Sequence, residues 1–108
     1  MTETKTEAPE FQAVNKITLA GRLTADPELK YTPSGKAVCR LRLAVNASKQ
    51  ALFIDVVAWE DVAEAAAQSL KKASPVTVEG RLQSRTWEKD GSKRTAIEVV
   101  ASTVTPAS

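Results

Sequence analysis

Apolar and polar side chains alternate along five stretches of the chain, a two-residue period that is typical of strands burying one face. The stretches are residues 16–23, 36–47, 52–59, 76–87 and 94–104, and residues 28–32 form a further short extended segment. The side chains expected to face inward are Ile17, Leu19, Cys39, Leu41, Leu43, Val45, Leu52, Ile54, Val56, Ala58, Val76, Val78, Gly80, Leu82, Ile97 and Val99. The pattern therefore predicts a mostly β protein.

The segments between these stretches contain residues that favour turns. Thr32, Pro33, Ser34 and Gly35 suit a type I turn, with Pro at its second and Gly at its fourth position. Asp90 and Gly91 form a two-residue hairpin signal between the last two stretches. Residues 46–50 are a short polar connection, so the second and third strands are expected to pair as an antiparallel hairpin.

One helix is predicted, over residues 60–72, which are rich in Ala with acids at the start and lysines at the end. Its narrow apolar face, expected to consist of Val62, Ala65, Ala66, Ser69 and Leu70, would close one end of a sheet. Three strands, a helix and two strands is the order of the oligonucleotide-binding (OB) fold, a five-stranded Greek-key barrel. Another kind of small barrel also fits five alternating strands. Residues 17–23 resemble residues 76–82, and we interpret the shared Gly as a residue needed at a barrel corner.

The length of 108 residues is that of one domain. We expect a flexible N-terminal arm over residues 1–13, an all-β domain over 14–104 and a short polar end over 105–108. No stretch is long and apolar enough for a signal peptide or a membrane span, so an intracellular, cytoplasmic protein without membrane contact is expected. The single Cys39 can form neither an intramolecular disulfide nor a cysteine metal cluster, and is expected in the core.

Histidine is absent, which removes the usual general base and the commonest metal ligand, so an enzyme is not expected. No Gly-rich phosphate loop is present either, and no metal or cofactor is expected. The net charge is +2. Residues 1–13 hold three glutamates and one lysine, which leaves 14 basic and 10 acidic side chains in the remainder. This mildly basic balance does not by itself identify a nucleic-acid binder.

The faces opposite the predicted core combine aromatic rings with basic side chains. Single-stranded nucleic acid needs this combination, because bases stack on rings and basic groups neutralise phosphates. The candidate binding residues are Arg40, Arg42, Lys49, Phe53, Trp59, Arg81, Arg85, Trp87, Lys89, Lys93 and Arg94. Alternatively, the rings pack in a subunit interface or beneath the helix, and Arg40 and Arg42 form a solvated face. For Asp55 and Glu98, ion pairing with nearby arginines is favoured over a catalytic or metal pair.

Several motifs resemble those of bacterial-type single-stranded DNA-binding proteins. They are NKITLAGRL at residues 15–23, DPELKY at 26–31, GKAV at 35–38, VVAW at 56–59 and VEGRL at 78–82, followed by Arg85 and Trp87. The similarity extends from residue 15 to about residue 104. It implies an OB fold, base stacking on Phe53, Trp59 and Trp87, and a homo-oligomer, a tetramer rather than a dimer, that coats exposed strands in replication, recombination and repair.

The chain departs from this family pattern in three places. Lys49 stands near the position of another stacking aromatic, the connection over residues 46–50 is short where the family often has a long basic loop, and the acidic C-terminal tail is missing. We therefore expect a short form that binds single-stranded DNA, or RNA, with shorter wrapping and without tail-mediated repair and replication partners. The alternative is a protein-interaction or primosome-type accessory module of the same fold.

Overall fold

The computed structural model describes residues 11–46 and 49–107, which form six strands and one helix. In chain order these are β1 (Ile17–Leu23), β2 (Glu28–Tyr31), β3 (Ala37–Val45), β4 (Leu52–Trp59), α1 (Glu60–Ser69), β5 (Pro75–Lys89) and β6 (Ser92–Pro106). Most of the predicted N-terminal arm, residues 1–10, lies outside the described residues, as do residues 47 and 48 of the predicted polar connection and residue 108. The elements follow the predicted order, with β2 as the short extended segment.

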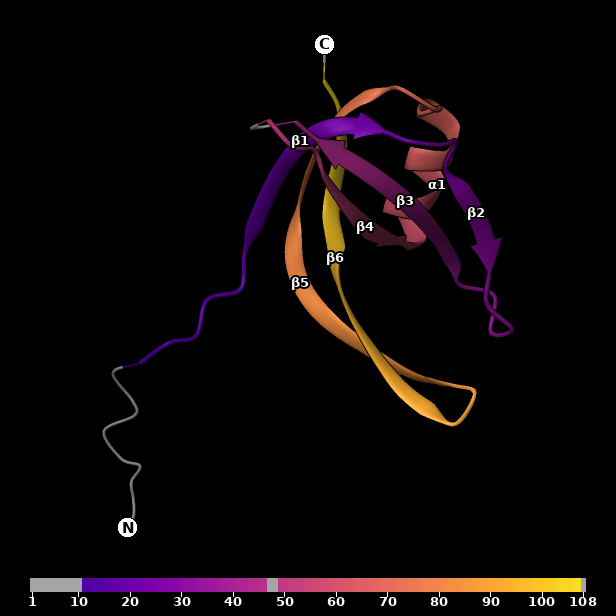
Figure 1. The fold of residues 1–108 in the computed structure, drawn as a ribbon. Coiled ribbons are helices and arrows are strands. Elements are labelled where there is room, and N and C mark those ends of the chain that lie inside the picture. The colour runs from indigo at the N-terminus through magenta and orange to yellow at the C-terminus, as the bar shows by residue number, and fades with distance from the viewer. Residues whose placement is uncertain (1–10, 47–48, 108) are drawn as a thin grey trace.

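The strands form one sheet in the order β1-β5-β6-β4-β3-β2, and β1 also pairs with β3 (Figure 1). This second pairing, at Arg22 with Ala44 and Leu23 with Leu43, closes β1, β5, β6, β4 and β3 into a ring. Short β2 lies outside the ring and pairs with β3. The β4–β6 contact is parallel and the other pairings are antiparallel. The predicted five-stranded OB fold is confirmed.

Two glycines lie where a neighbouring strand leaves no room for a side chain. A Cβ atom on Gly21 would be 2.2 Å from the carbonyl oxygen of Ala44, at the seam where β1 meets β3. A Cβ atom on Gly80 would be 2.1 Å from the carbonyl oxygen of Val100, next to a register shift between Glu79 and Gly80. No side chain fits at these distances, which explains why the similar stretches of β1 and β5 both contain Gly.

The barrel interior is filled by fully buried aliphatic side chains, including Leu43, Val56, Val76, Val78 and Val99. Cys39 is also fully buried, as predicted. Three predictions of inward-facing residues are wrong, because Leu52, Leu82 and Ile97 are exposed. Leu52 is the first residue of β4, at the end of the sheet, and Leu82 and Ile97 lie where β5 and β6 leave the barrel.

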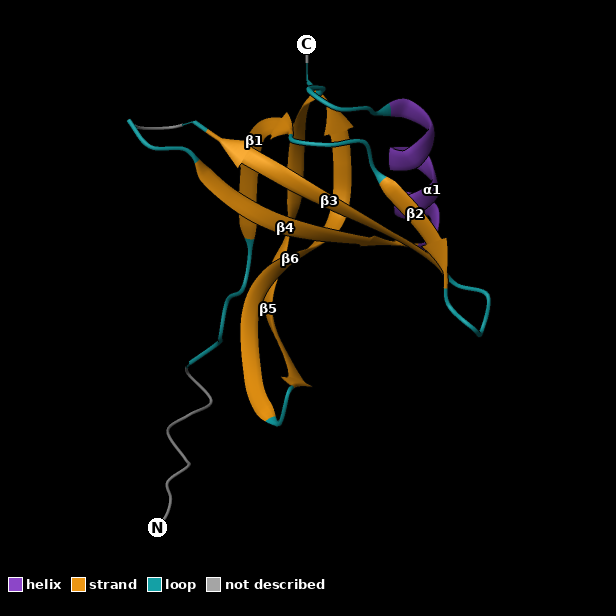
Figure 2. Cartoon of the chain, turned by 45° about the vertical axis from the view of Figure 1, so that its right-hand side comes forward, coloured by secondary structure: helices purple, strands orange, loops and turns teal. Residues whose placement is uncertain are grey.

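Helix α1 covers one end of the barrel and packs against β3, β4 and β6 (Figure 2). It buries Ala63 and Ala66, whereas Ala65 and Ser69 of the predicted apolar face are exposed. The helix ends at Ser69, before the lysines that were predicted to close it. The segment after it is held instead by Asp26, whose Oδ1 accepts a hydrogen bond from the Lys72 backbone N–H at 2.7 Å. No helix in the described part of the chain has the length and apolar character that a membrane crossing requires.

Strands β5 and β6 continue past the barrel as a two-stranded ribbon (Figures 1 and 2). Asp90 and Gly91 form its turn with φ angles of 53° and 79°, the two positive values of a type I′ hairpin. Both strands are longer than predicted, because the pairing continues to Lys89 with Ser92 at the turn and to Val76 with Pro106 at the other end. Each strand is 15 residues long over its whole length, and the ribbon that they form past the barrel presents two faces.

Candidate nucleic-acid interface

The pairing of β3 with β4 places four of the predicted site residues on the outer face of the barrel. Residues directly opposite in an antiparallel pair point to the same face. Arg42 is opposite Asp55 and Arg40 is opposite Val57. On β4, Phe53 lies two residues before Asp55, and Trp59 lies two residues after Val57. Phe53 is 52% exposed and Trp59 is 39% exposed. The sequence prediction that these rings share a face with arginines is therefore consistent with the observed register.

Arg42 links a carboxylate to an aromatic ring. Its Nη1 donates a hydrogen bond to Asp55 Oδ1 at 2.9 Å, and its guanidinium carbon lies 5.6 Å from the centre of the Phe53 ring. Both charged side chains are about half exposed, so water screens the pair and it contributes little to stability. Its effect is to hold the guanidinium group beside the ring.

Glu98 on β6 holds two more arginines, and it is 3% exposed. Its Oε1 lies 3.3 Å from Arg85 Nε of β5 and 3.5 Å from Arg40 Nη1 of β3. Its Oε2 accepts a hydrogen bond from Gln83 Nε2 at 3.2 Å. The interpretation of Asp55 and Glu98 as ion-pair partners of arginines is confirmed by these contacts.

The reach of Arg40 explains an unexpected burial. Val57 alternates with the β4 residues predicted to face inward, and it shares the outer face with Arg40, yet it is 2% exposed. Strand β4 lies between β3 and β6 in the sheet, so the Arg40 side chain must cross β4 to approach Glu98. Arginine stems cover apolar surface while the charged end stays polar, and Val57 lies directly on this path.

The ribbon continues the outer face away from the barrel. Alternation along β5 places Arg81, Gln83, Arg85, Trp87 and Lys89 on one face, with Arg94 of β6 directly opposite Trp87. The Arg85 guanidinium carbon lies 4.5 Å from the centre of the Trp87 ring, a cation–π contact. Lys93 belongs to the other face, because it pairs with Glu88, so it is separated from the other predicted residues of the hairpin tip.

Trp59 borders a hollow that the sequence interpretation missed. Its volume is about 460 Å³, and it is lined by Thr32, Ser34, Lys36, Trp59 and Glu60. The pairing of Val38 with Trp59 brings the turn before β3 next to this ring. The predicted turn at residues 32–35 could have indicated this hollow. Because β3 pairs with β4 as far as Trp59, the turn before β3 must lie next to that ring. Lys36 thereby becomes an additional basic residue of the candidate site.

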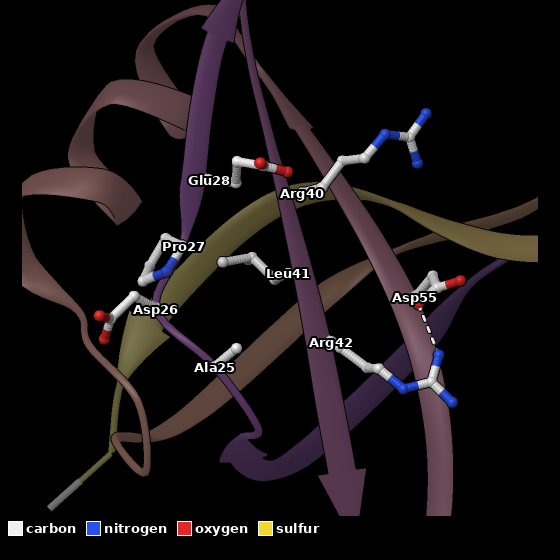
Figure 3. Close-up of a pocket in the computed structure, with 8 residues that line it drawn as sticks. All are labelled: Ala25, Asp26, Pro27, Glu28, Arg40, Leu41, Arg42 and Asp55. Atoms are coloured by element: carbon white, nitrogen blue, oxygen red, sulfur yellow. Dashed lines mark hydrogen bonds and ion pairs between the residues drawn. The ribbon is translucent and has the colours of Figure 1, made fainter.

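A second hollow, of about 420 Å³, lies beside β3 (Figure 3). Its lining consists of Ala25, Asp26, Pro27, Glu28, Arg40, Leu41, Arg42 and Asp55. Figure 3 shows the Arg42 side chain turned toward Asp55, whereas Asp26 and Glu28 lie on the other side of β3. Three carboxylates offset the two arginines here, so this hollow is a poorer place for a phosphate than the ribbon face.

Three further side chains can ionise: Lys49, Tyr31 and Cys39. Lys49 is exposed, in the connection that precedes β4. A hydrogen bond to Glu64, at 3.1 Å, raises the pKa of the Tyr31 hydroxyl. Burial raises the pKa of the Cys39 thiol, which keeps it protonated and unreactive. Within residues 11–46 and 49–107 no group of acidic or sulfur side chains is arranged to hold a metal ion.

Comparison with known proteins shows which sequences this chain resembles. The model of the single-strand binding protein family matches residues 14–107. Single-stranded DNA-binding protein 2 of Listeria innocua is 46% identical over 99 residues, which cover 84% of this chain and 62% of the relative. Single-stranded DNA-binding proteins of Bacillus cereus and Treponema pallidum are 44% and 39% identical, with 84% of this chain covered and 58% and 56% of theirs. The chain thus spans about 60% of the length of these relatives. It belongs to the single-strand binding protein family.

Proposed function

We propose that this protein binds single-stranded DNA with little sequence preference, and that it does so without catalysing a reaction. The observation that carries the proposal is the association of rings with cations on one outer face. Arg42 lies at Phe53, Arg85 lies at Trp87, and Lys36 lies in the hollow beside Trp59. Rings stack on unpaired bases, and cations neutralise the phosphates between them.

The shape of this face favours a single strand over a duplex. The rings lie on strands β4 and β5 of a curved sheet, and no described helix carries basic residues that could enter a major groove. Bases in a duplex are already stacked on each other, so they gain nothing from a ring. The names of the relatives support DNA as the ligand, and roles in replication, recombination and repair in the cytoplasm follow as part of the proposal.

The proposed binding residues are Arg40, Arg42, Lys49, Phe53, Trp59, Arg81, Arg85, Trp87, Lys89 and Arg94, with Lys36 added. Lys93 contributes through long-range attraction, because it lies on the other face of the ribbon. Both tryptophans of the chain, Trp59 and Trp87, belong to the proposed face. Binding should therefore be visible in the intrinsic fluorescence.

The test is a fluorescence titration with oligo-dT strands of graded length at two or more salt concentrations. We expect strong quenching, and a logarithm of the affinity that falls with the logarithm of salt concentration by about 0.7 per neutralised phosphate. Duplex DNA of matched length serves as the control and should bind far more weakly, and an RNA strand tests the sugar preference. Equal affinity for duplex and single strand would contradict the proposal.

We also infer that the protein assembles with copies of itself. Leu82 and Ile97 lie on the ribbon face opposite Trp87 and are exposed there. On one edge, β1 pairs with β3 at Arg22 and Leu23, and in the described part of the chain residues 17–20 have no strand partner on that edge. Exposed aliphatic side chains and an open strand edge are surfaces that a second copy covers. A tetramer is the assembly that the family resemblance implies.

A further inference from the structure

Glu98 is a buried carboxylate on a face that carries several exposed charged and aromatic side chains. Its side chain is 4% exposed, whereas those of its partners Arg40 and Arg85 are 50% and 41% exposed. It therefore lies beneath the two arginines and is not a surface charge that happens to meet them.

Both carboxylate oxygens of Glu98 are occupied, and the partners come from both sides of β6. Arg40 reaches it from β3 across β4, and Gln83 and Arg85 reach it from the neighbouring strand β5. Arg85 uses Nε and Arg40 uses one Nη atom for these contacts. A guanidinium group has five N–H donors, so most of those on both arginines remain for a phosphate.

Stability alone does not account for such an arrangement. Burying an ion pair costs desolvation that roughly offsets its attraction, and apolar replacements of similar size are often tolerated. What the buried carboxylate adds is geometry, because it sets where two long and otherwise mobile side chains point. Arg85 is held with its guanidinium group over the Trp87 ring at 4.5 Å, on the proposed binding face.

The pair of Arg42 with Asp55 provides a comparison within the same face. There, too, a carboxylate holds an arginine at a ring, but Asp55 is half exposed and holds one arginine. Water can replace Asp55 at little cost, whereas Glu98 itself is buried, so water competes less for its contacts. The two carboxylates should therefore differ in how firmly they hold their arginines.

We propose that Glu98 is a positioning residue for nucleic-acid binding, which holds Arg40 and Arg85 in fixed places so that their remaining donors meet phosphates beside the Trp87 platform. The proposal rests on the proposed function. Glu98 does not touch the DNA strand itself. It acts through the two guanidinium groups, and preorganisation of this kind reduces the entropy that the arginines lose on binding.

The test compares Glu98→Gln with Glu88→Gln in the full chain. Both changes remove one negative charge and so raise the net charge by one. Glu88 is an exposed residue on the opposite face of the ribbon. Charge alone makes both variants bind oligo-dT as tightly as the wild type or slightly more tightly. Loss of positioning makes Glu98→Gln bind about tenfold more weakly, because its amide presents N–H donors to groups that are themselves donors.

A second readout needs no DNA. In a Trp59→Phe background Trp87 is the single tryptophan, and acrylamide quenching of its fluorescence reports how far Arg85 covers the ring. We expect the quenching constant to rise in Glu98→Gln and in Arg85→Ala, and to stay unchanged in Glu88→Gln. Circular dichroism and thermal unfolding establish that each variant is folded.

Wild-type affinity in a folded Glu98→Gln variant overturns the proposal, whatever the quenching. If that variant does not fold, Arg85→Lys decides, since it keeps the charge but loses the Nε–H contact and the planar stack. Arg85→Lys should also bind about tenfold more weakly with a more accessible Trp87, and wild-type values for both would overturn the proposal. Failure of the wild type to bind oligo-dT would refute the proposed function instead, and the quenching result would still report on Glu98.

Discussion

The same arrangement of three side chains occurs at two rings of the outer face. Each time an aromatic ring, an arginine and a carboxylate lie close together. At Phe53 it consists of the ring, Arg42 and Asp55, and at Trp87 it consists of the ring, Arg85 and Glu98. A guanidinium group lies near each ring. In the proposed function, a base would stack on the other side of each ring, with the arginine close to the adjoining phosphate.

Adjacent residues at the start of β4 provide a matched test of stacking. Leu52 and Phe53 are each 52% exposed, and they point to opposite faces because successive strand residues alternate. Phe53→Ala should weaken binding of oligo-dT by about 1–3 kcal/mol, since a base loses its platform. Leu52→Ala should leave the affinity unchanged.

The measurement is a titration of both variants under identical salt, with circular dichroism as a check of folding. An equal loss in both variants would show that the end of β4 matters for folding or assembly and not for stacking.

At the scale of elements, the ribbon of β5 and β6 separates two kinds of surface. One face carries Arg85, Trp87 and Arg94, and the other exposes Leu82 and Ile97. The ribbon extends beyond the barrel, so neither face is covered by the core (Figure 2). A single two-stranded element can in this way serve a charged ligand on one side and an apolar contact on the other.

Lys93 and Arg94 test this division because they are neighbours on opposite faces. Arg94→Ala removes a cation opposite Trp87, so the salt dependence of oligo-dT binding should become shallower by about 0.7 in the log–log slope. Lys93→Ala removes a cation that faces Glu88 on the other side of the ribbon, and its slope should change much less than that of Arg94→Ala. Equal changes in both slopes would mean that DNA wraps around the tip of the ribbon.

At the scale of the whole molecule, the barrel leaves apolar side chains of β5 and β6 outside its core. Ile97 is 57% exposed and lies on the same ribbon face as Leu82. This apolar surface and the open edge of β1 are the two features that a second copy would cover.

Ile97→Lys should therefore reduce the mass of the assembly, because it places a charge in the contact between copies. Analytical ultracentrifugation of the full chain measures this mass. Gln68→Lys, which adds the same charge to the exposed side of α1, is the control and should assemble like the wild type. A monomeric wild type, or unchanged mass in Ile97→Lys, would contradict this assignment of the interface.

The sequence by itself determined the strands, their turns and the chemistry of the candidate site. Alternation and the Asp90–Gly91 turn are local signals, because each depends on the few residues around it. The rings and arginines could be placed on an outer face for the same reason. The end of α1 was less accurate, since its last turn is set by contacts such as that of Asp26 with Lys72.

Only the tertiary structure decided which alternating positions are covered. Leu82 and Ile97 follow an inward pattern but lie where the ribbon has left the barrel, so no core is beneath them. Val57 and Glu98 follow an outward pattern, yet they are buried, because Arg40 reaches across β4 to Glu98. Alternation assigns a side chain to a face, and burial depends on what distant strands bring over that face.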